Sequence, residues 1–287
     1  MAIQRSNINV SLRKKRRLSR MKKIAYSTIF ILFFITLGIL GLTSNTVRVH
    51  TVVVTGNKTV SNEQISTIVN TILDKKYVWI IPTDNYLLLG RDDIKDQILK
   101  TIQTINVVQV SFHGLNTIEV TVSERVAQDL WCVDNPSASK NCFLMDTTGF
   151  VFATSSFAIA TSSATSTFPI YFGFIKGENP VGKFYFDSHR FNEIAELMRV
   201  LTQMNFGPKY FYAVDEHTYQ VYLRDGGKIL LNNAKTFQGS LTNLQAVMND
   251  GFIKTDEVSL KKISYIDLQS DNKVFCSPSA VCKQTGR

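Results

Sequence analysis

The chain has 287 residues, enough for more than one domain, and a formal net charge of +9. Nine of the 32 basic residues lie within residues 1–23, which hold no acid, so residues 24–287 carry 23 basic and 23 acidic residues. The net positive charge therefore belongs to the N-terminal tail alone, and the neutral remainder gives no support to a broad basic surface for nucleic acid.

Residues 24–42 form an uncharged apolar stretch, IAYSTIFILFFITLGILGL. A helix of this length rises about 28 Å, close to the hydrocarbon thickness of a bilayer. We predict a transmembrane helix over residues 24–43, in which hydroxyls such as those of Thr28 and Thr36 bond back to carbonyls of the preceding turn. The run is longer than a signal-peptide core and no A-x-A site follows it. It therefore favours an uncleaved anchor over a cleaved signal peptide or a buried core helix.

The basic tail at residues 1–23 sets the expected orientation. Positive charge beside the first apolar span stays inside, so the N-terminus is predicted to be cytoplasmic and everything after the span extracytoplasmic. Lys14–Arg17 next to a membrane would also attract anionic lipid.

The first domain after the span is predicted at residues 47–123, with the order β-α-α-β-β. Ser61–Gln64 has the spacing of a capping box, and Asp92 stands at the start of a second helical pattern. The expected elements are a strand at 47–54, a helix opened by Ser61, a helix from about residue 92, and strands at 107–112 and 117–122.

A second domain, mixed but mostly antiparallel β with two helices, is predicted at residues 124–276, followed by a tail at 277–287. Residues 153–168 are rich in Ser and Thr and are interpreted as a mobile surface loop. The expected strands lie at 126–133, 142–145, 150–152, 210–214, 218–223, 228–231, 263–268 and 273–276, with helices at 188–204 (Ser188 as cap) and 237–249. Residues 169–172 resume the ordered chain after the loop. The fold class is therefore α+β.

Several stretches carry a family resemblance. VVVTGNKTVSNEQI and INVVQVSFHGLNTIEVTVSER resemble a POTRA domain. With the basic tail, the single span, FLMDTTGFVF and the ending LKKISYIDLQSDNKVFC, the chain resembles the FtsQ/DivIB cell-division proteins from residue 24 to about 276. The order of the motifs is what is specific. Gln269 stands where that family usually has a basic residue.

The resemblance implies a non-enzymatic scaffold in the bacterial inner membrane at the division septum. Such proteins bind the bitopic coiled-coil proteins FtsB and FtsL and help to bring the septal peptidoglycan synthase to midcell. It implies no cofactor and no small-molecule substrate. The alternative is a POTRA-bearing subunit of a protein export or outer-membrane assembly machine. A single POTRA copy behind an anchor argues against that alternative, because those proteins usually carry tandem copies.

The sequence holds no catalytic or metal-binding constellation. Its four histidines are scattered without the spacing of a zinc site. Ser259–Lys262 and Ser270–Asn272 match the S-x-x-K and S-D-N motifs of penicillin-binding proteins. That serine should open a helix, whereas here it precedes a predicted strand, and no K-T-G follows. We therefore predict no enzymatic activity and no metal.

All four cysteines follow the span. An even number in an exported domain indicates disulfides, and four cysteines allow three connectivities. Local pairing is the simplest, and free thiols are the alternative. The candidates are Cys132, Cys142, Cys276 and Cys282.

The last predicted strand, residues 273–276, has no later strand to cover it and is a template for another chain. Alternation places Val274 and Cys276 on one face and Lys273 and Phe275 on the other. The resemblance implies the same place, since FtsQ proteins receive FtsB by strand addition at their last strand. The candidate partner-binding residues are Tyr265, Asn272, Lys273, Val274 and Phe275. Alternatively, the tail at 278–287, pinned by a Cys276–Cys282 bond, folds back and blocks this edge.

Overall fold

A computed structural model describes residues 6–42, 44–77, 81–82, 84–86, 88–133, 141–155, 168–175, 177, 179–234, 236–253, 260–270 and 273–277. The chain forms two compact units, residues 1–124 and 125–287. The first holds the N-terminal helix and a small α+β domain, and the second holds a large mixed sheet with two long helices. The predicted α+β class is confirmed.

The N-terminal helix α1 covers Ser6–Leu42 and so begins well upstream of the predicted span. Its part Met21–Gly41 is long and apolar enough to cross a membrane. The hydroxyl of Thr28 donates to the carbonyl of Ile24 at 2.6 Å, and that of Thr36 donates to Leu32 at 2.5 Å. The predicted back-bonding of these hydroxyls is thus confirmed, and it leaves neither polar group unsatisfied in an apolar setting.

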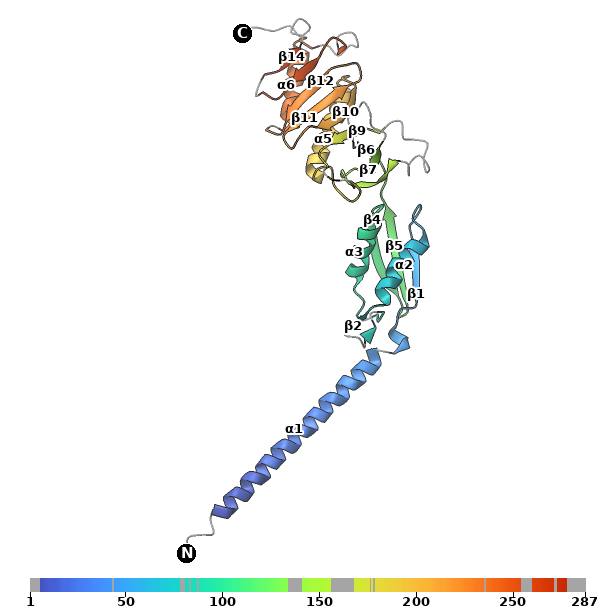
Figure 1. Ribbon diagram of the computed structural model, residues 1–287, viewed down its shortest axis with the longest axis vertical. Helices are drawn as coiled ribbons and strands as arrows, with labels where there is room; N and C mark the ends of the chain where they lie inside the picture. The colour runs from blue at the N-terminus through green and yellow to red at the C-terminus, as the bar shows by residue number, and fades with distance from the viewer. Residues whose placement is uncertain are drawn as a thin grey trace. The chain divides into compact units, whose positions relative to one another are not determined.

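The small domain has the predicted β-α-α-β-β order, with a short additional hairpin between the helices. Its elements are the 3-10 turn η1 (Asn45–Val47), β1 (Thr51–Thr55), α2 (Asn62–Leu73), β2 (Lys76–Tyr77), β3 (Ile81–Pro82), α3 (Arg91–Thr101), β4 (Ile105–His113) and β5 (Thr117–Glu124). The main sheet has the order β1-β5-β4, with β1 parallel and β4 antiparallel to β5. Helices α2 and α3 cover one face of it (Figure 1).

Apolar residues spaced along both helices fill the core of this domain. Ile65 and Val69 of α2 and Ile94 and Ile98 of α3 are completely buried against Ile118 and Val120 of β5. The capping box at the start of α2 is confirmed: Gln64 N–H donates to the Ser61 hydroxyl at 3.2 Å, and Ser61 N–H donates to the Gln64 side chain at 3.3 Å.

The predicted start of the first strand, residue 47, is wrong. β1 begins at Thr51 because the preceding residues pair with a different segment. Val49 N–H donates to the carbonyl of Asp84 at 2.8 Å, and Tyr86 N–H donates to Val47 at 2.8 Å. The Arg48 guanidinium also contacts the Asp84 carboxylate at 2.6 Å. Alternation of β-branched residues indicated extended backbone but could not show which segment it would pair with.

The carboxylate of Glu124 ties the end of β5 to the loop before α2. It accepts hydrogen bonds from the backbone N–H groups of Lys58 (2.6 Å), Thr59 (2.9 Å) and Val60 (3.0 Å), and from the Thr59 hydroxyl. Burial raises the pKa of Glu124, but the hydrogen bonds from Thr59, Val60 and Lys58 outweigh it and leave the pKa below its usual value. The charged carboxylate therefore fixes the loop.

The second unit is built on a nine-stranded sheet. Its elements are β6 (Asp129–Cys132), β7 (Cys142–Met145), β8 (Val151–Thr154), β9 (Ile170–Gly173), α5 (Ser188–Gln203), β10 (Pro208–Ala213), β11 (Thr218–Leu223), β12 (Lys228–Asn232), α6 (Phe237–Asn249), β13 (Tyr265–Asp267) and β14 (Phe275–Ser277). The strand order is β14-β13-β12-β11-β10-β9-β6-β7-β8. Strand β9 is parallel to both of its neighbours, and β12 is parallel to β13.

Helices α5 and α6 bury one face of this sheet. Phe191 and Leu197 of α5 and Leu244 of α6 belong to one buried cluster with Val221 of β11 and Ile266 of β13. The opposite face carries a second small cluster made by Leu130, Leu144, Phe150 and Phe152. The sheet therefore has an inner face that forms the main core and an outer face that is only partly covered.

Several predicted boundaries in this unit are wrong, among them those at the start of α5 and at the end of β8. Asp187, not Ser188, caps α5, because its carboxylate accepts the N–H of Arg190 at 3.0 Å. The predicted loop at 153–168 begins too early, since Ala153 and Thr154 belong to β8 and pair with β7. At its other end Phe168 packs against the second small cluster. Residues 156–167 lie outside the described part.

A disulfide joins Cys132 to Cys142, which stand directly opposite each other on β6 and β7. Cys276 is disulfide-bonded as well, and Cys282 lies outside the described residues. The Cys132–Cys142 bond spans a sequence separation of 10. In the chain-entropy account, closing so short a loop contributes roughly 2–3 kcal/mol to stability.

Candidate functional site

The candidate site is the β14 edge of the large sheet, at β13 and β14. In the strand order β14 comes last, so no strand of the described part pairs with its outer side. Figure 1 shows β14, in red, at the end of the sheet away from β7. Strand β13 pairs antiparallel with β14 in the register Tyr265–Ser277, Ile266–Cys276 and Asp267–Phe275. An edge strand of this kind can pair with an added chain through its main-chain groups.

The predicted alternation of side chains along the last strand matches the structure, although the strand itself is displaced. It covers Phe275–Ser277, not 273–276, so Lys273 and Val274 lie just before it. Val274 and Cys276 pack against the main core, whereas Lys273 is exposed and the side chain of Phe275 is 49 % exposed. Asn272 lies outside the described residues, and so do residues 278–287, the tail that in the alternative blocks this edge.

Tyr265 and Phe275 lie on the same outer face of the sheet. Their register makes them diagonal neighbours across the strand pair, a spacing at which aromatic side chains can touch a common ligand. Tyr265 is 37 % exposed, while Ile266 beside it is fully buried. We call Tyr265, Asp267, Phe275 and Ser277 the edge surface. Aromatic side chains left partly in water at the last strand of a sheet are suited to anchor a partner.

The turn after β13 is fixed to β12 through Gln269. Its N–H donates to the Asp267 carboxylate at 2.8 Å, and its amide donates to the carbonyl of Leu231 at 3.3 Å. The side chain of Asn232 donates to the carbonyl of Gln269 at 3.1 Å. Gln269 stands where the FtsQ/DivIB proteins usually have a basic residue. Its hydrogen bonds to Asp267 and to residues of β12 hold the end of β13, and with it the edge surface, against β12.

In the part of the chain that the structure describes, no group of three or more His, Cys, Asp or Glu side chains has the arrangement of a metal site. Ser259 and Asn272, from the two motifs that resemble penicillin-binding proteins, fall among the residues that are not described.

The structure adds one buried polar pair to which the sequence had assigned no role. Asp129, 7 % exposed, is hydrogen-bonded to Tyr171. The pKa of Asp129 is raised to about 7. Burial is the main cause, the hydrogen bond from Tyr171 opposes the rise, and the charge of Asp146 adds to it. Asp146 itself is paired with Arg125. The signal available in the sequence was an acid at the start of the otherwise apolar strand DLWC.

Comparison with known proteins identifies the first domain. Residues 47–125 match the family model of the POTRA domain, FtsQ-type. The resemblance drawn from the sequence is confirmed over this stretch, and together with the apolar helix it is consistent with the FtsQ/DivIB family. No curated protein matches the chain. POTRA domains mediate protein–protein interactions, and the FtsQ type is associated with cell division and is generally non-enzymatic.

Proposed function

We propose that this chain, which carries an FtsQ-type POTRA domain, is a non-enzymatic scaffold of the bacterial division machinery. The observation that carries the proposal is the FtsQ-type domain at residues 47–125, which directly follows an apolar helix long enough to span a membrane. In this role the chain binds FtsB/FtsL-like bitopic proteins outside the cytoplasm and helps to recruit septal peptidoglycan synthesis.

The edge surface supports a specific mode of binding. A partner segment adds as a further strand beside β14, and its main-chain groups pair with those of the edge strand. Main-chain pairing supplies affinity for almost any extended segment. The aromatic side chains of Tyr265 and Phe275 supply specificity. They make apolar contact only with those side chains of the partner strand that project on the same outer face of the sheet.

The orientation follows from the charge distribution. Nine basic residues and no acid precede the apolar stretch, so the N-terminus is placed in the cytoplasm and both folded domains outside it. The basic tail also lies where it can contact anionic lipid of the inner leaflet.

The orientation predicts the outcome of a reporter fusion. A phosphatase that is active only outside the cytoplasm, fused after Arg287, should be active, and a cytoplasm-only reporter at the same place should be silent. A matched variant of the fusion replaces Arg13, Lys14, Lys15, Arg16 and Arg17 by Glu and should lower the phosphatase signal, since it removes most of the inside signal. A silent phosphatase in the unmodified fusion would contradict the proposed topology.

Depletion of the chain tests the cellular role. Cells that lose it should continue to elongate without dividing, and a fluorescently labelled septal synthase should no longer gather at midcell. Expression of the wild-type chain from a plasmid should restore both. Normal septation combined with a defect in export or outer-membrane assembly would instead support the alternative role in such a machine.

A further inference from the structure

A depression of about 590 Å³ lies at one end of the large sheet, where β6, β9 and β10 end and β11 begins. Its lining combines an apolar wall with one acidic turn. The wall is formed by Trp131, Val133, Gly173, Phe174, Ile175 and Val214, and the turn by Asp215, Glu216, His217 and Thr218. The volume falls within the range of pockets that hold small ligands or several side chains.

The wall is held in an unusual backbone conformation. Gly173 and Phe174 both have positive φ, 79° and 68°, which is rare for a bulky residue such as Phe174. A side chain at position 173 would stand 2.1 Å from the carbonyl oxygen of Ala213. The Gly173 carbonyl accepts the indole N–H of Trp131 at 2.9 Å, and Phe174 stacks on Phe186 with ring centroids 4.2 Å apart. Such conformations persist only where the surroundings fix them, and they concentrate at binding sites.

The mouth of the depression is both apolar and acidic. Val133 and Val214 are 46 % and 44 % exposed, high values for large aliphatic side chains. The Asp215 carboxylate accepts the N–H groups of His217 (2.7 Å) and Thr218 (2.8 Å). The bond from His217, with that from Thr218, lowers the pKa of Asp215, so this carboxylate stays ionised at neutral pH. The described residues that line the depression include no Lys or Arg.

We propose that this depression binds a protein segment in which an apolar side chain stands next to a Lys or Arg. The apolar side chain fills the space between Trp131, Phe174 and Val214, and the cation meets the carboxylate of Asp215. The charge of the segment follows from complementarity, because the ionised carboxylate of Asp215 stands at the mouth and the described lining residues include no Lys or Arg. An acidic segment is therefore repelled.

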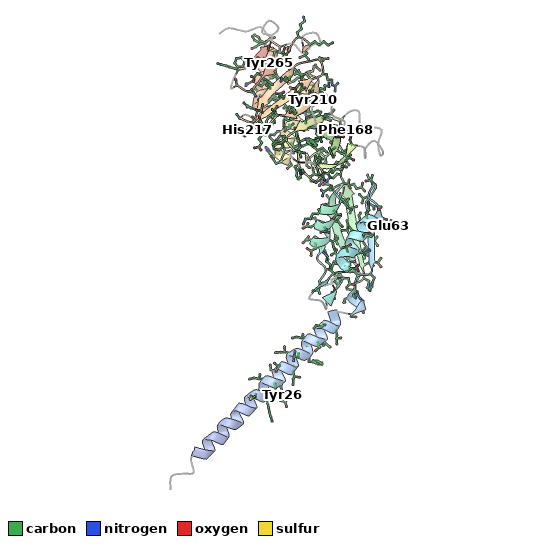
Figure 2. The ribbon with its side chains drawn as sticks, in the orientation of Figure 1. Tyr26, Glu63, Phe168, Tyr210, His217 and Tyr265 are labelled. Atoms are coloured by element: carbon green, nitrogen blue, oxygen red, sulfur yellow. A yellow bond between two sulfur atoms is a disulfide. The ribbon has the colours of Figure 1, made fainter. Side chains whose placement is uncertain are left out.

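This surface is distinct from the edge surface. The turn between β10 and β11 and the strand β14 are separated in the sheet order by β12 and β13. Figure 2 shows the labelled His217 well away from Tyr265. Binding at the depression therefore does not depend on strand addition at β14, and the second unit gains a second docking surface.

The test uses Trp131 as a reporter. The chain has two tryptophans, so Trp79→Phe leaves Trp131, which lines the depression, as the only one. This full-length variant is placed in zwitterionic lipid nanodiscs, to which a cationic peptide has little electrostatic attraction. The probe is acetyl-Ser-Leu-Lys-Leu-Lys-Ser-amide. Its matched control carries Glu in place of both Lys residues.

The Lys peptide should shift the Trp131 emission with a saturable curve, and the Glu peptide should bind at least tenfold more weakly. Glu216→Lys should weaken binding of the Lys peptide at least tenfold, and Val214→Ser should also weaken it, whereas Phe275→Asp should leave it unchanged. Circular dichroism verifies the fold of each variant. No saturable shift, equal binding of both peptides, or indifference to both Glu216→Lys and Val214→Ser overturns the proposal. Loss through Phe275→Asp alone would overturn it too, because it would place the peptide at the edge surface.

Discussion

Phe275→Asp is expected to weaken binding of an FtsB-like partner at least 100-fold. The substitution removes an aromatic side chain that stands half exposed on the edge strand, and it places a carboxylate where the added strand must dock. Central aromatic anchors of interfaces commonly contribute about 2 kcal/mol or more, which is more than tenfold in affinity, and an uncompensated buried charge adds to the loss. Calorimetric titration of the full-length chain with the extracytoplasmic segment of the partner measures the effect.

Two controls separate binding from folding. Val274 and Cys276 make the contacts of this segment with the core, so the Phe275 variant should keep its circular dichroism spectrum. Phe184 is exposed to a similar degree and lies between β9 and α5, far along the chain from β14, so Phe184→Asp should change affinity less than threefold. Tyr265→Ala should give an intermediate loss. Full binding by a folded Phe275→Asp variant would place the interface on another surface.

Asp129 is expected to make the second unit less stable as the pH rises from about 4 to about 7. Its folded pKa, about 7, lies above the ordinary value of 3.8 that describes the unfolded chain. Below pH 4 Asp129 is protonated in both the folded and the unfolded state, and the neutral carboxyl makes its full contribution to the free energy of unfolding. As the pH rises, the unfolded state releases the proton first, and the contribution is lost through pH 7. At 1.36 kcal/mol per pKa unit, the loss amounts to up to about 4 kcal/mol.

Asp129→Asn should abolish this pH dependence and raise the free energy of unfolding at pH 7.5 relative to the wild type. Its amide can still bond to Tyr171, and the variant carries no charge to bury. Urea unfolding, followed by Trp131 emission in the Trp79→Phe background, measures it at pH 4.5 and 7.5. Glu124 and Asp215, whose pKa values are lowered, lose stabilisation as the pH falls, so the difference between variant and wild type is the quantity to compare. Asp250→Asn, at an exposed carboxyl, serves as the matched control. Parallel profiles for Asp129→Asn and the wild type would contradict the assignment.

The two proposed surfaces give the second unit separate ways to recognise partners. The edge surface offers main-chain pairing with aromatic side chains beside it, and the depression offers an apolar space with an acidic mouth. A scaffold that uses both can hold two segments at once. Because linked binding events raise the effective local concentration, each contact can be weak on its own and the assembly still stable.

Features that depend on neighbours a few residues away could be predicted from the amino-acid sequence. The capping box at Ser61, the bounds of α6 and the back-bonding of Thr28 and Thr36 are all confirmed because their hydrogen bonds close within four residues. The β-α-α-β-β order of the first domain followed from helical and strand periodicity in the same way. The alternation around Phe275 held even though the strand boundary moved, since side chains alternate in any extended segment.

Features that depend on segments far apart in the chain could not be predicted from the sequence and are seen only in the folded molecule. Residues 47–49 could either extend β1 or pair with residues 84–86, and in the structure they do the latter. Hydrophobic periodicity indicates an extended segment but contains no information about which segment it pairs with. The parallel placement of β9 between β6 and β10 brings Trp131, Phe174 and Val214 around one depression, although more than 80 residues separate the first from the last. The same placement buries Asp129 against Tyr171. Burial and non-local pairing set the charge of that carboxyl and the position of the β14 edge, and both arise only when the whole sheet has assembled.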